Sequence, residues 1–277
     1  PHPHRTMCLP ACHSHLRHWV SRRAFLATSL GVVATSAAGA PLPAPPLREG
    51  PIRRVVDLTH TLDPDFPTFS GLPQLAVRPL SRLAADGWNV HEWTLNEHTG
   101  THLDAPLHRS TGSGLEAIPP QNLVGPLAVI DLRDRAQTNP DTELTPDDVR
   151  RWESRHGPLA EGAIVALCSG WGAHARTPRF RGADTQGTLH FPGFHADTAD
   201  FLLTARTVKG IIVDTLSLDP GPSRDFPVHT RWLGSGRWGL ECAANLDQLP
   251  ATGATVVVGA PKVAGGSGGP SRVLALL

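Results

Sequence analysis

Four side chains that commonly bind metals lie close together in the segment His98–His108, which reads HTGTHLDAPLH. They are His98, His102, Asp104 and His108. Imidazole nitrogens and a carboxylate form the mixed ligand set that suits zinc, manganese or iron. The alternative is a polar surface turn, but several unpaired imidazoles beside a carboxylate are costly to bury without a compensating cation. The segment therefore predicts a metal site.

The chain that carries these four residues is expected to be extended. Gly100 and Pro106 disfavour a helix, because glycine weakens a helix interior and proline removes an amide donor. In an extended segment, side chains at even offsets point to the same face, and all four candidates have even numbers. Asn89–Asn96 alternates as a strand that leads into the segment. We therefore expect one strand face to present all four ligands.

The rest of the chain alternates predicted strands with a few helices. Helices are expected at Thr145–His156, with Thr145 as N-cap and Pro146 in the first turn, and at Gly193–Arg206. Strands are expected at Arg54–His60, Leu127–Asp131, Ala163–Cys168, Gly210–Asp214, Ala254–Gly259 and Arg272–Leu277. This alternation indicates an α/β fold.

The segment His98–His108 resembles the signature of the metal-dependent cyclase-like hydrolases, the group that includes bacterial kynurenine formamidase and isatin hydrolase. The similarity runs from about Val55 to the C-terminus and includes Asp214–Asp219 and the glycine-rich Gly265–Val273. The glycine-rich stretch looks closer to the isatin hydrolases than to the formamidases. The resemblance implies a swivelling β/β/α domain of the α/β class, with a single catalytic domain.

The same resemblance implies further ligands downstream. His229 and Glu241 lie where the formamidase members carry a second histidine and a glutamate that complete a two-metal site. The expected cofactor is a divalent metal, Zn or Mn, with one or two ions per chain. One ion is expected on His98, His102 and Asp104; with a second ion, Asp104 or Glu241 bridges. The full set of expected ligands is His98, His102, Asp104, His108, His229 and Glu241.

These ligands indicate a hydrolase of a small amide, lactam or related carbonyl compound, arylformamidase-like or isatin-hydrolase-like. A bound metal lowers the pKa of water to about 7 and polarises a carbonyl group. His108 or Glu241 is the expected general acid or base. The groups expected to hold the ligating histidine tautomers are Asp57, Thr99 or Thr101.

Four aromatic side chains are candidates for a substrate-binding wall, with core packing as the alternative for each. Phe66 and Phe69 lie in a loop rich in proline, Trp88 precedes the metal segment, and Trp171 follows the predicted strand Ala163–Cys168. Cys168 and Cys242 could pair in an oxidising compartment, but both flank apolar segments that resemble strands, so two buried free thiols are expected.

Two other functional interpretations compete with a metal-dependent hydrolase. Gly265–Gly269 matches the Gly-x-Ser-x-Gly nucleophile motif, which requires a following helix and a later histidine. Only eight residues follow Gly269 and the last histidine is His229, so this mechanism is excluded. The second alternative is a non-catalytic exported metal-binding protein. Structural zinc sites usually have four Cys or His ligands, whereas this set contains carboxylates.

The N-terminal residues have the pattern of an export signal. Ser21–Leu26 (SRRAFL) is a twin-arginine motif, followed by the apolar run Ala27–Gly39. That run is about 13 residues long, against roughly 20 needed to cross a bilayer, so no stable membrane span is expected. We expect an N-terminal extension and Tat signal peptide at 1–40, a proline-rich linker at 41–51 and the hydrolase domain at 52–277, with a periplasmic or extracellular location.

The charge balance gives no electrostatic reason to expect a nucleic-acid partner. The chain has 25 basic and 25 acidic side chains, whereas proteins that bind nucleic acid usually carry a basic patch. The expected partner is a small-molecule substrate. The family resemblance further implies a homodimer or homotetramer.

Overall fold

The structure is a computed structural model that describes residues 51–277. The expected signal peptide and all but the last residue of the expected linker lie outside the described residues. Within the described part, no helix has the length and apolar composition needed to cross a bilayer.

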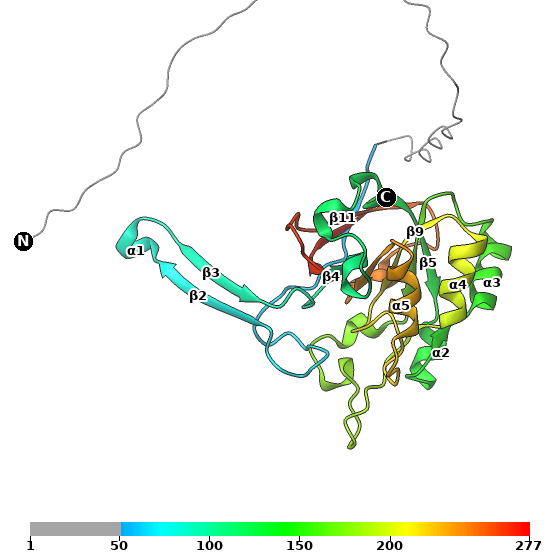
Figure 1. Cartoon of the computed structure of the whole chain (residues 1–277), viewed down its shortest axis with the longest axis horizontal. Helices are drawn as coiled ribbons and strands as arrows, with labels where there is room; N and C mark the ends of the chain where they lie inside the picture. Colours follow the sequence, from blue (N-terminus) through cyan, green and yellow to red (C-terminus); the bar gives the residue numbers. More distant parts are fainter. Residues whose placement is uncertain (1–50) are drawn as a thin grey trace, which may run out of the picture. The chain divides into compact units, whose positions relative to one another are not determined.

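A nine-stranded mixed sheet forms the centre of the fold (Figure 1). Its order is β1 (Val55–Asp57), β13 (Arg272–Leu276), β11 (Ala254–Gly259), β5 (Val124–Asp131), β7 (Ala163–Cys168), β9 (Val208–Val213), β10 (Trp238–Glu241), β4 (His102–Asp104) and β12 (Gly268–Pro270). The four strands from β5 to β10 are parallel, and the pairings outside them are antiparallel. All six residues of β7 are buried, as expected for a parallel strand covered on both faces.

Alternate residues of the central strands pack into two separate cores. Ala128 and Ile130 of β5 face the helices α3 (Pro146–His156), α4 (Ala196–Ala205) and α5 (Pro227–Gly234), which pack together on one side (Figure 1). Leu127 and Val129 face the opposite side, where apolar residues of β1, β11 and β13 enclose the second core. The alternation follows from the two-residue period of a strand.

Local sequence signals predicted helix α3 correctly. Thr145 accepts a hydrogen bond from the Asp148 amide and the Asp148 carboxylate accepts one from the Thr145 amide, so both halves of a capping box are present. The helix begins at Pro146, and Gly157 ends it with a φ of 86°.

The helix predicted at Gly193–Arg206 begins later than expected. Gly193–Phe194 instead forms strand β8, which pairs with β6 (Glu143–Leu144). Helix α4 then begins at Ala196, because His195 Nδ1 caps it by accepting a hydrogen bond from the Asp197 amide. A tertiary strand pairing thus replaced the first helical turn.

The smaller elements lie in the connections. They are β2 (Leu75–Ser81), α1 (Leu83–Asp86), β3 (Val90–Leu95), α2 (Arg133–Thr138) and the 3-10 helices Pro106–His108, Leu115–Ala117, Pro120–Asn122, Trp171–His174, Pro178–Phe180 and Leu246–Gln248. Strands β2 and β3 form a separate two-stranded sheet that extends away from the central sheet (Figure 1). Every residue of β3 is exposed. The predicted strand before the metal segment therefore exists, but it is not part of the nine-stranded sheet.

Candidate metal centre

The candidate ligands of the segment His98–His108 do not lie on one strand face, so that expectation is wrong. Gly100, with a φ of 65°, turns the chain between His98 and His102. Strand β4 covers only three residues, and Pro106 begins a 3-10 helix that ends at His108. The side chains nevertheless converge, because the chain folds around a common point from both ends of β4.

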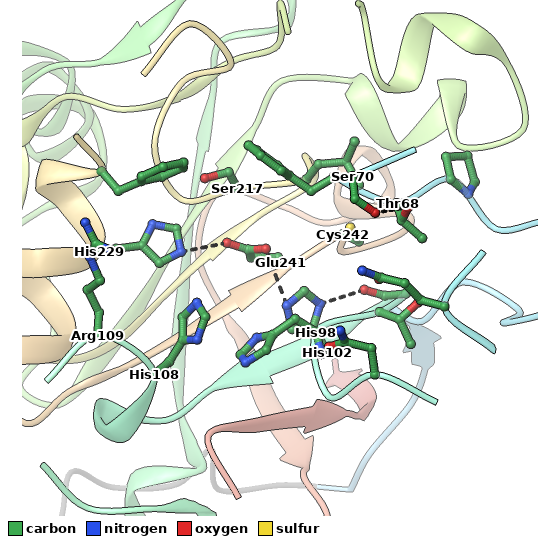
Figure 2. Close-up of a pocket in the computed structure, with 18 residues that line it drawn as sticks. Thr68, Ser70, His98, His102, His108, Arg109, Ser217, His229, Glu241 and Cys242 are labelled. Atoms are coloured by element: carbon green, nitrogen blue, oxygen red, sulfur yellow. Dashed lines mark hydrogen bonds and ion pairs between the residues drawn. The ribbon is translucent and has the colours of Figure 1, made fainter. Parts of the chain in front are cut away.

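The sheet register brings the downstream candidates to the same point. Glu241 of β10 pairs directly with His102 of β4, although the two residues are far apart in the sequence. His229 projects from the first half of α5 and is buried. Figure 2 shows the rings of His98, His102, His108 and His229 gathered around one space beside Glu241. The structure thus brings all six expected ligands together.

The Asp104 carboxylate lies at the centre of the cluster and has no exposed surface. Its Oδ1 atom lies 2.7 Å from His98 Nδ1 and 3.3 Å from His102 Nε2. Its Oδ2 atom lies 3.7 Å from His229 Nε2. One carboxylate therefore contacts three of the four candidate imidazoles.

A second buried carboxylate, Glu241, contacts His102 and His229 of the same cluster. Glu241 Oε2 lies 3.4 Å from His102 Nε2, and Oε1 lies 3.1 Å from His229 Nε2. The Leu218 amide donates a hydrogen bond of 3.0 Å to Oε1 and fixes the side chain. Burial raises the pKa of Glu241, and the neighbouring Asp104 charge adds to this effect. Glu241 thus needs a cation nearby to remain ionised. Burial alone would also raise the pKa of Asp104, but its contacts with the imidazoles hold that pKa well below its usual value.

Two histidines are held so that Nδ1 faces a fixed acceptor and Nε2 faces the cluster. His102 Nδ1 lies 2.9 Å from the carbonyl oxygen of Gly100, which can only accept, so Nδ1 carries the hydrogen. His229 Nδ1 lies 2.6 Å from Asp219 Oδ2. Asp219 also accepts hydrogen bonds from the amides of Val228 and His229. Both Nε2 atoms are then available as ligands.

Two atoms of the cluster show that a cation fits this space. His102 Nε2 and Asp104 Oδ2 are buried and have no hydrogen-bond partner. Leaving such groups unpaired costs free energy, and a metal ion would satisfy both. Ligand atoms within 4.8 Å of one another form two groups, His98–Asp104–His108 and His102–Asp104–Glu241. Because Asp104 belongs to both groups, the residues fit one or two metal ions.

The electrostatics of the cluster favour a positive charge. Burial alone would lower the pKa of His102, but Asp104 and Glu241 raise it to about 9. Burial opposes a charge on His229 as well, yet hydrogen bonds to Asp219 and Glu241 raise its pKa to about 10. Metal ions therefore compete with protons for these nitrogens, and binding is expected to strengthen as pH rises.

His108 differs from the other imidazoles, because it lies at the solvent edge of the cluster. Burial lowers its pKa to about 4, with Asp104 opposing this effect and the neighbouring histidines adding to it. Its ring centre lies 3.8 Å from that of His98. His108 is thus neutral at pH 7 and able to accept a proton, as the sequence-based assignment of a general base requires.

A cavity of about 330 Å³ opens onto the cluster. The candidate ligands on its wall are His98, His102, His108, His229 and Glu241, and Phe69, Arg109, Ser217, Phe226 and Cys242 lie around them. Phe69 and Phe226 contact each other with ring centres 5.9 Å apart. This combination of metal-binding groups and aromatic rings suits a small aromatic carbonyl compound.

Only Phe69 of the four predicted substrate-binding residues lines this cavity. Phe66 is 3% exposed and packs edge-on against Phe180 in a small core. Trp171 belongs to the same core, and its indole N–H donates to the Phe180 carbonyl. Trp88 is 65% exposed, between α1 and β3. Phe66, Trp88 and Trp171 therefore do not line the cavity of this chain, and the structure does not support their predicted role in substrate binding.

The sequence-based search missed several residues of the site. Phe226 precedes α5, has a φ of 50° and packs edge-on against His229. Phe226 lies three residues before the candidate ligand His229, and this proximity in the sequence could have indicated that it belongs to the site. Asp219 was also missed as the partner of His229, although it lies in the segment Asp214–Asp219 that resembles the family.

The three residues predicted to orient the histidines have other contacts. Asp57 pairs with Arg272 at the surface, and the Thr101 hydroxyl donates to the Cys242 carbonyl. Thr99 is buried and lines the cavity. Cys168 and Cys242 are both buried free thiols, as predicted.

Comparisons with known proteins agree with this geometry. Residues 56–220 match the family model Cyclase, described as "Putative cyclase". Isatin hydrolase of Roseibium aggregatum is 33% identical over 245 residues, which cover 80% of this chain and 91% of the relative. Kynurenine formamidase of Salinibacter ruber is 25% identical over 223 residues, covering 79% and 96%.

A solved structure confirms the α/β fold predicted from the sequence. Isatin hydrolase A from Labrenzia aggregata, bound to benzyl benzoate, superposes with a TM-score of 0.75 at 38% identity, covering 81% of this chain and 93% of that one. The similar proteins are hydrolases, so the non-catalytic alternative is not favoured. This chain belongs to the cyclase family of metal-dependent hydrolases and shares the single-domain mixed α/β fold of its members.

Proposed function

We propose that this enzyme opens the amide bond of a small aromatic lactam of the isatin type, with aryl formamides as the second candidate class. The observation that carries the proposal is the pair of buried carboxylates, Asp104 and Glu241, with His102 and His229 aiming free Nε2 atoms between them. The higher identity to isatin hydrolase than to kynurenine formamidase supports the lactam as the first candidate.

The proposed ligands of a first metal ion are His98, His102 and Asp104. A second ion would be held by His108, His229 and Glu241, with Asp104 or Glu241 shared. Zinc or manganese suits this set of nitrogen and oxygen donors. When bound, the metal supplies a water molecule acidic enough to attack at neutral pH and polarises the substrate carbonyl.

The protein's own side chains orient the substrate and move the proton. Phe69, in the loop before β2, and Phe226, at the start of α5, form one adjoining aromatic surface on the cavity wall, against which an aromatic ring of the substrate can pack. Neutral His108 takes the proton released as water attacks the carbonyl carbon, and returns it to the nitrogen as the C–N bond breaks. Glu241 is the alternative proton carrier. The Arg109 guanidinium lines the cavity and is placed to attract the carboxylate that the reaction forms.

The test is to measure bound metal per chain and hydrolysis of isatin and N-formylkynurenine, before and after chelation. Loss of hydrolysis on chelation, in protein that stays folded, supports the proposal. His102→Ala and Asp104→Ala are expected to lose metal and activity together. Bound metal without either activity would contradict the proposed substrate classes, and full activity after chelation would contradict the metal mechanism.

We also propose that two or four copies of the chain associate through the sheet of β2 and β3. Val77 and Trp93 are cross-strand neighbours on one face, 44% and 70% exposed, beside the pair Leu75 and Leu95. A two-stranded sheet is marginally stable alone, so this apolar face needs a partner. Light scattering of the wild type and of Trp93→Ser tests the proposal: an assembly unchanged by the substitution, or a wild-type monomer, would contradict it.

The proposed location is periplasmic or extracellular, after Tat export of a chain with signal residues 1–40 and linker residues 41–51. The twin-arginine motif at Arg22 and Arg23 supports this. Replacing both arginines by lysine should retain the full-length chain in the cytoplasm. Export unaffected by that change would contradict the proposal.

A further inference from the structure

The glycine-rich segment Gly265–Gly269, for which a nucleophile motif was excluded, lies against the candidate metal centre. Gly268 and Gly269 of β12 pair with Asp104 and Leu103 of β4. A Cβ atom at Gly268 would lie 2.4 Å from His98 Cε1, so only glycine permits this approach. The packing places Ser267 directly beside the His98 ring.

The Ser267 hydroxyl contacts two side chains that are adjacent in the sequence, Glu97 and His98. Ser267 donates through Oγ to Glu97 Oε2, and the Ser267 amide donates to Glu97 Oε1 at 3.2 Å. The same Oγ lies 3.0 Å from His98 Nε2. The backbone is also fixed here, because the His98 amide donates to Asn96 Oδ1 at 3.0 Å.

The direction of these hydrogen bonds determines the His98 tautomer. A serine hydroxyl has one hydrogen, and a carboxylate can only accept, so the Ser267 hydrogen is directed to Glu97. Ser267 Oγ must then accept from His98, which places the ring hydrogen on Nε2. In the neutral ring Nδ1 carries a lone pair, 2.7 Å from Asp104 Oδ1. Two acceptor atoms cannot lie that close unless a cation lies between them. In the metal-free protein that cation is a proton on Nδ1, which donates to Asp104, and a bound metal ion would take its place.

We propose that Ser267 and Glu97 are positioning residues that hold His98 with Nε2 protonated and Nδ1 free to bind a metal. The arrangement parallels those at His102 and His229, where the Gly100 carbonyl and Asp219 accept from the outward nitrogen. The inference rests on the proposed metal site and adds to it two residues that contact neither metal nor substrate. Glu97 is essential to it, because without this acceptor the hydroxyl is free to donate to His98 and reverse the tautomer.

The experiment measures the dissociation constant of Zn²⁺ or Mn²⁺ by competition with a chromogenic chelator, using the full chain. Ser267→Ala and Glu97→Gln should each raise the dissociation constant roughly 10- to 100-fold, the usual effect of removing a partner of a ligating histidine. Ser267→Thr keeps the hydroxyl and should stay within about threefold of the wild type. Ser271→Ala is the matched control, because the Ser271 hydroxyl bonds only the Gly269 carbonyl.

A second set of variants tests whether the effect passes through His98. In a His98→Ala background, adding Ser267→Ala should not weaken the remaining metal binding further. Unchanged affinity in either Ser267→Ala or Glu97→Gln would overturn the inference, as would an equal loss in Ser267→Thr or a further loss in the His98→Ala background. If Ser267→Ala fails to fold, Glu97→Gln and Ser267→Thr still decide the question. Failure of the wild type to bind either metal would instead refute the proposed metal site.

Discussion

Glu241 lies directly opposite His102 in the antiparallel pairing of β10 with β4, and its Oε2 atom is 3.4 Å from His102 Nε2. The register of a sheet therefore sets the distance between two candidate ligands. Sheet registers resist slippage where both faces are buried, as they are here, so the site is built on a rigid part of the fold.

Removing the charge of Glu241 tests its part in metal binding. Glu241→Gln keeps the size of the side chain but leaves Asp104 as the one carboxylate among the expected ligands, so we expect the metal dissociation constant to rise at least about tenfold. Chelator competition measures this change. The exposed Glu161→Gln is the control, and equal metal affinity in both variants would show that Glu241 is not a ligand.

His108→Ala distinguishes a proton carrier from a ligand. If His108 only moves the proton, kcat should fall roughly 10²- to 10⁴-fold while the bound metal per chain stays constant. If His108 holds a second ion, the metal count should fall as well. Metal analysis together with steady-state kinetics separates the two results, and an unchanged kcat would exclude both roles.

Asp219→Asn removes the charge of the carboxylate that holds the His229 ring through Nδ1. The carboxylate accepts from His229 Nδ1 and from two amides at the start of α5, so the variant should lose metal affinity about 10- to 100-fold and unfold at a lower temperature. Asp225→Asn, in the exposed loop before the same helix, should do neither. Wild-type affinity in Asp219→Asn would contradict the assigned orientation of His229.

Phe69→Ala should raise KM roughly tenfold for an aromatic substrate and change kcat less, because the ring contributes to binding rather than to proton transfer. Leu72→Ala is a matched control, since Leu72 is 68% exposed in the same loop and does not line the cavity. Equal KM values for both variants would place the substrate elsewhere.

Acid stability should depend on Asp148. Burial alone would raise its pKa, but hydrogen bonds from Arg135 and Thr145 lower it to about 2, whereas an unfolded aspartate has a pKa near 4. The stabilisation is therefore complete above about pH 4 and is lost as the pH falls toward 2. Urea unfolding with chelator present should show a larger loss between about pH 4 and pH 2 in the wild type than in Asp148→Asn, which should already be less stable at pH 7.

Local signals in the sequence predicted those features that neighbouring residues determine. Helix α3 was predicted with its cap because Thr145, Pro146 and Gly157 act within a few residues of one another. The metal segment was also identified, but for an incomplete reason. The parity of the residue numbers predicted one strand face, whereas the turn at Gly100 produces the convergence.

Burial and long-range register were not visible in the sequence. Phe66, Phe69 and Trp171 are all aromatic and were equally good candidates in the sequence. The fold nevertheless buries Phe66 and Trp171 in a core and places Phe69 at the cavity. Asp219 was missed because its partner His229 becomes its neighbour only when α5 docks. Residue types and spacing were enough to pick out His98, His102, Asp104 and His108 as expected ligands. His229 and Glu241 were added only through family resemblance, which supplies the register that a single sequence lacks.

The contact between Ser267 and His98 joins residues 169 positions apart, and this separation has a consequence for biosynthesis. A nascent chain that has made the segment His98–His108 still lacks the strand that covers it, and β4 pairs with β12 only after residue 270 has been synthesised. Metal captured earlier would sit on a loose, incompletely oriented set of imidazoles. The imidazoles therefore reach their final orientation only after residues 267–270 have left the ribosome, when most of the catalytic domain has already been synthesised.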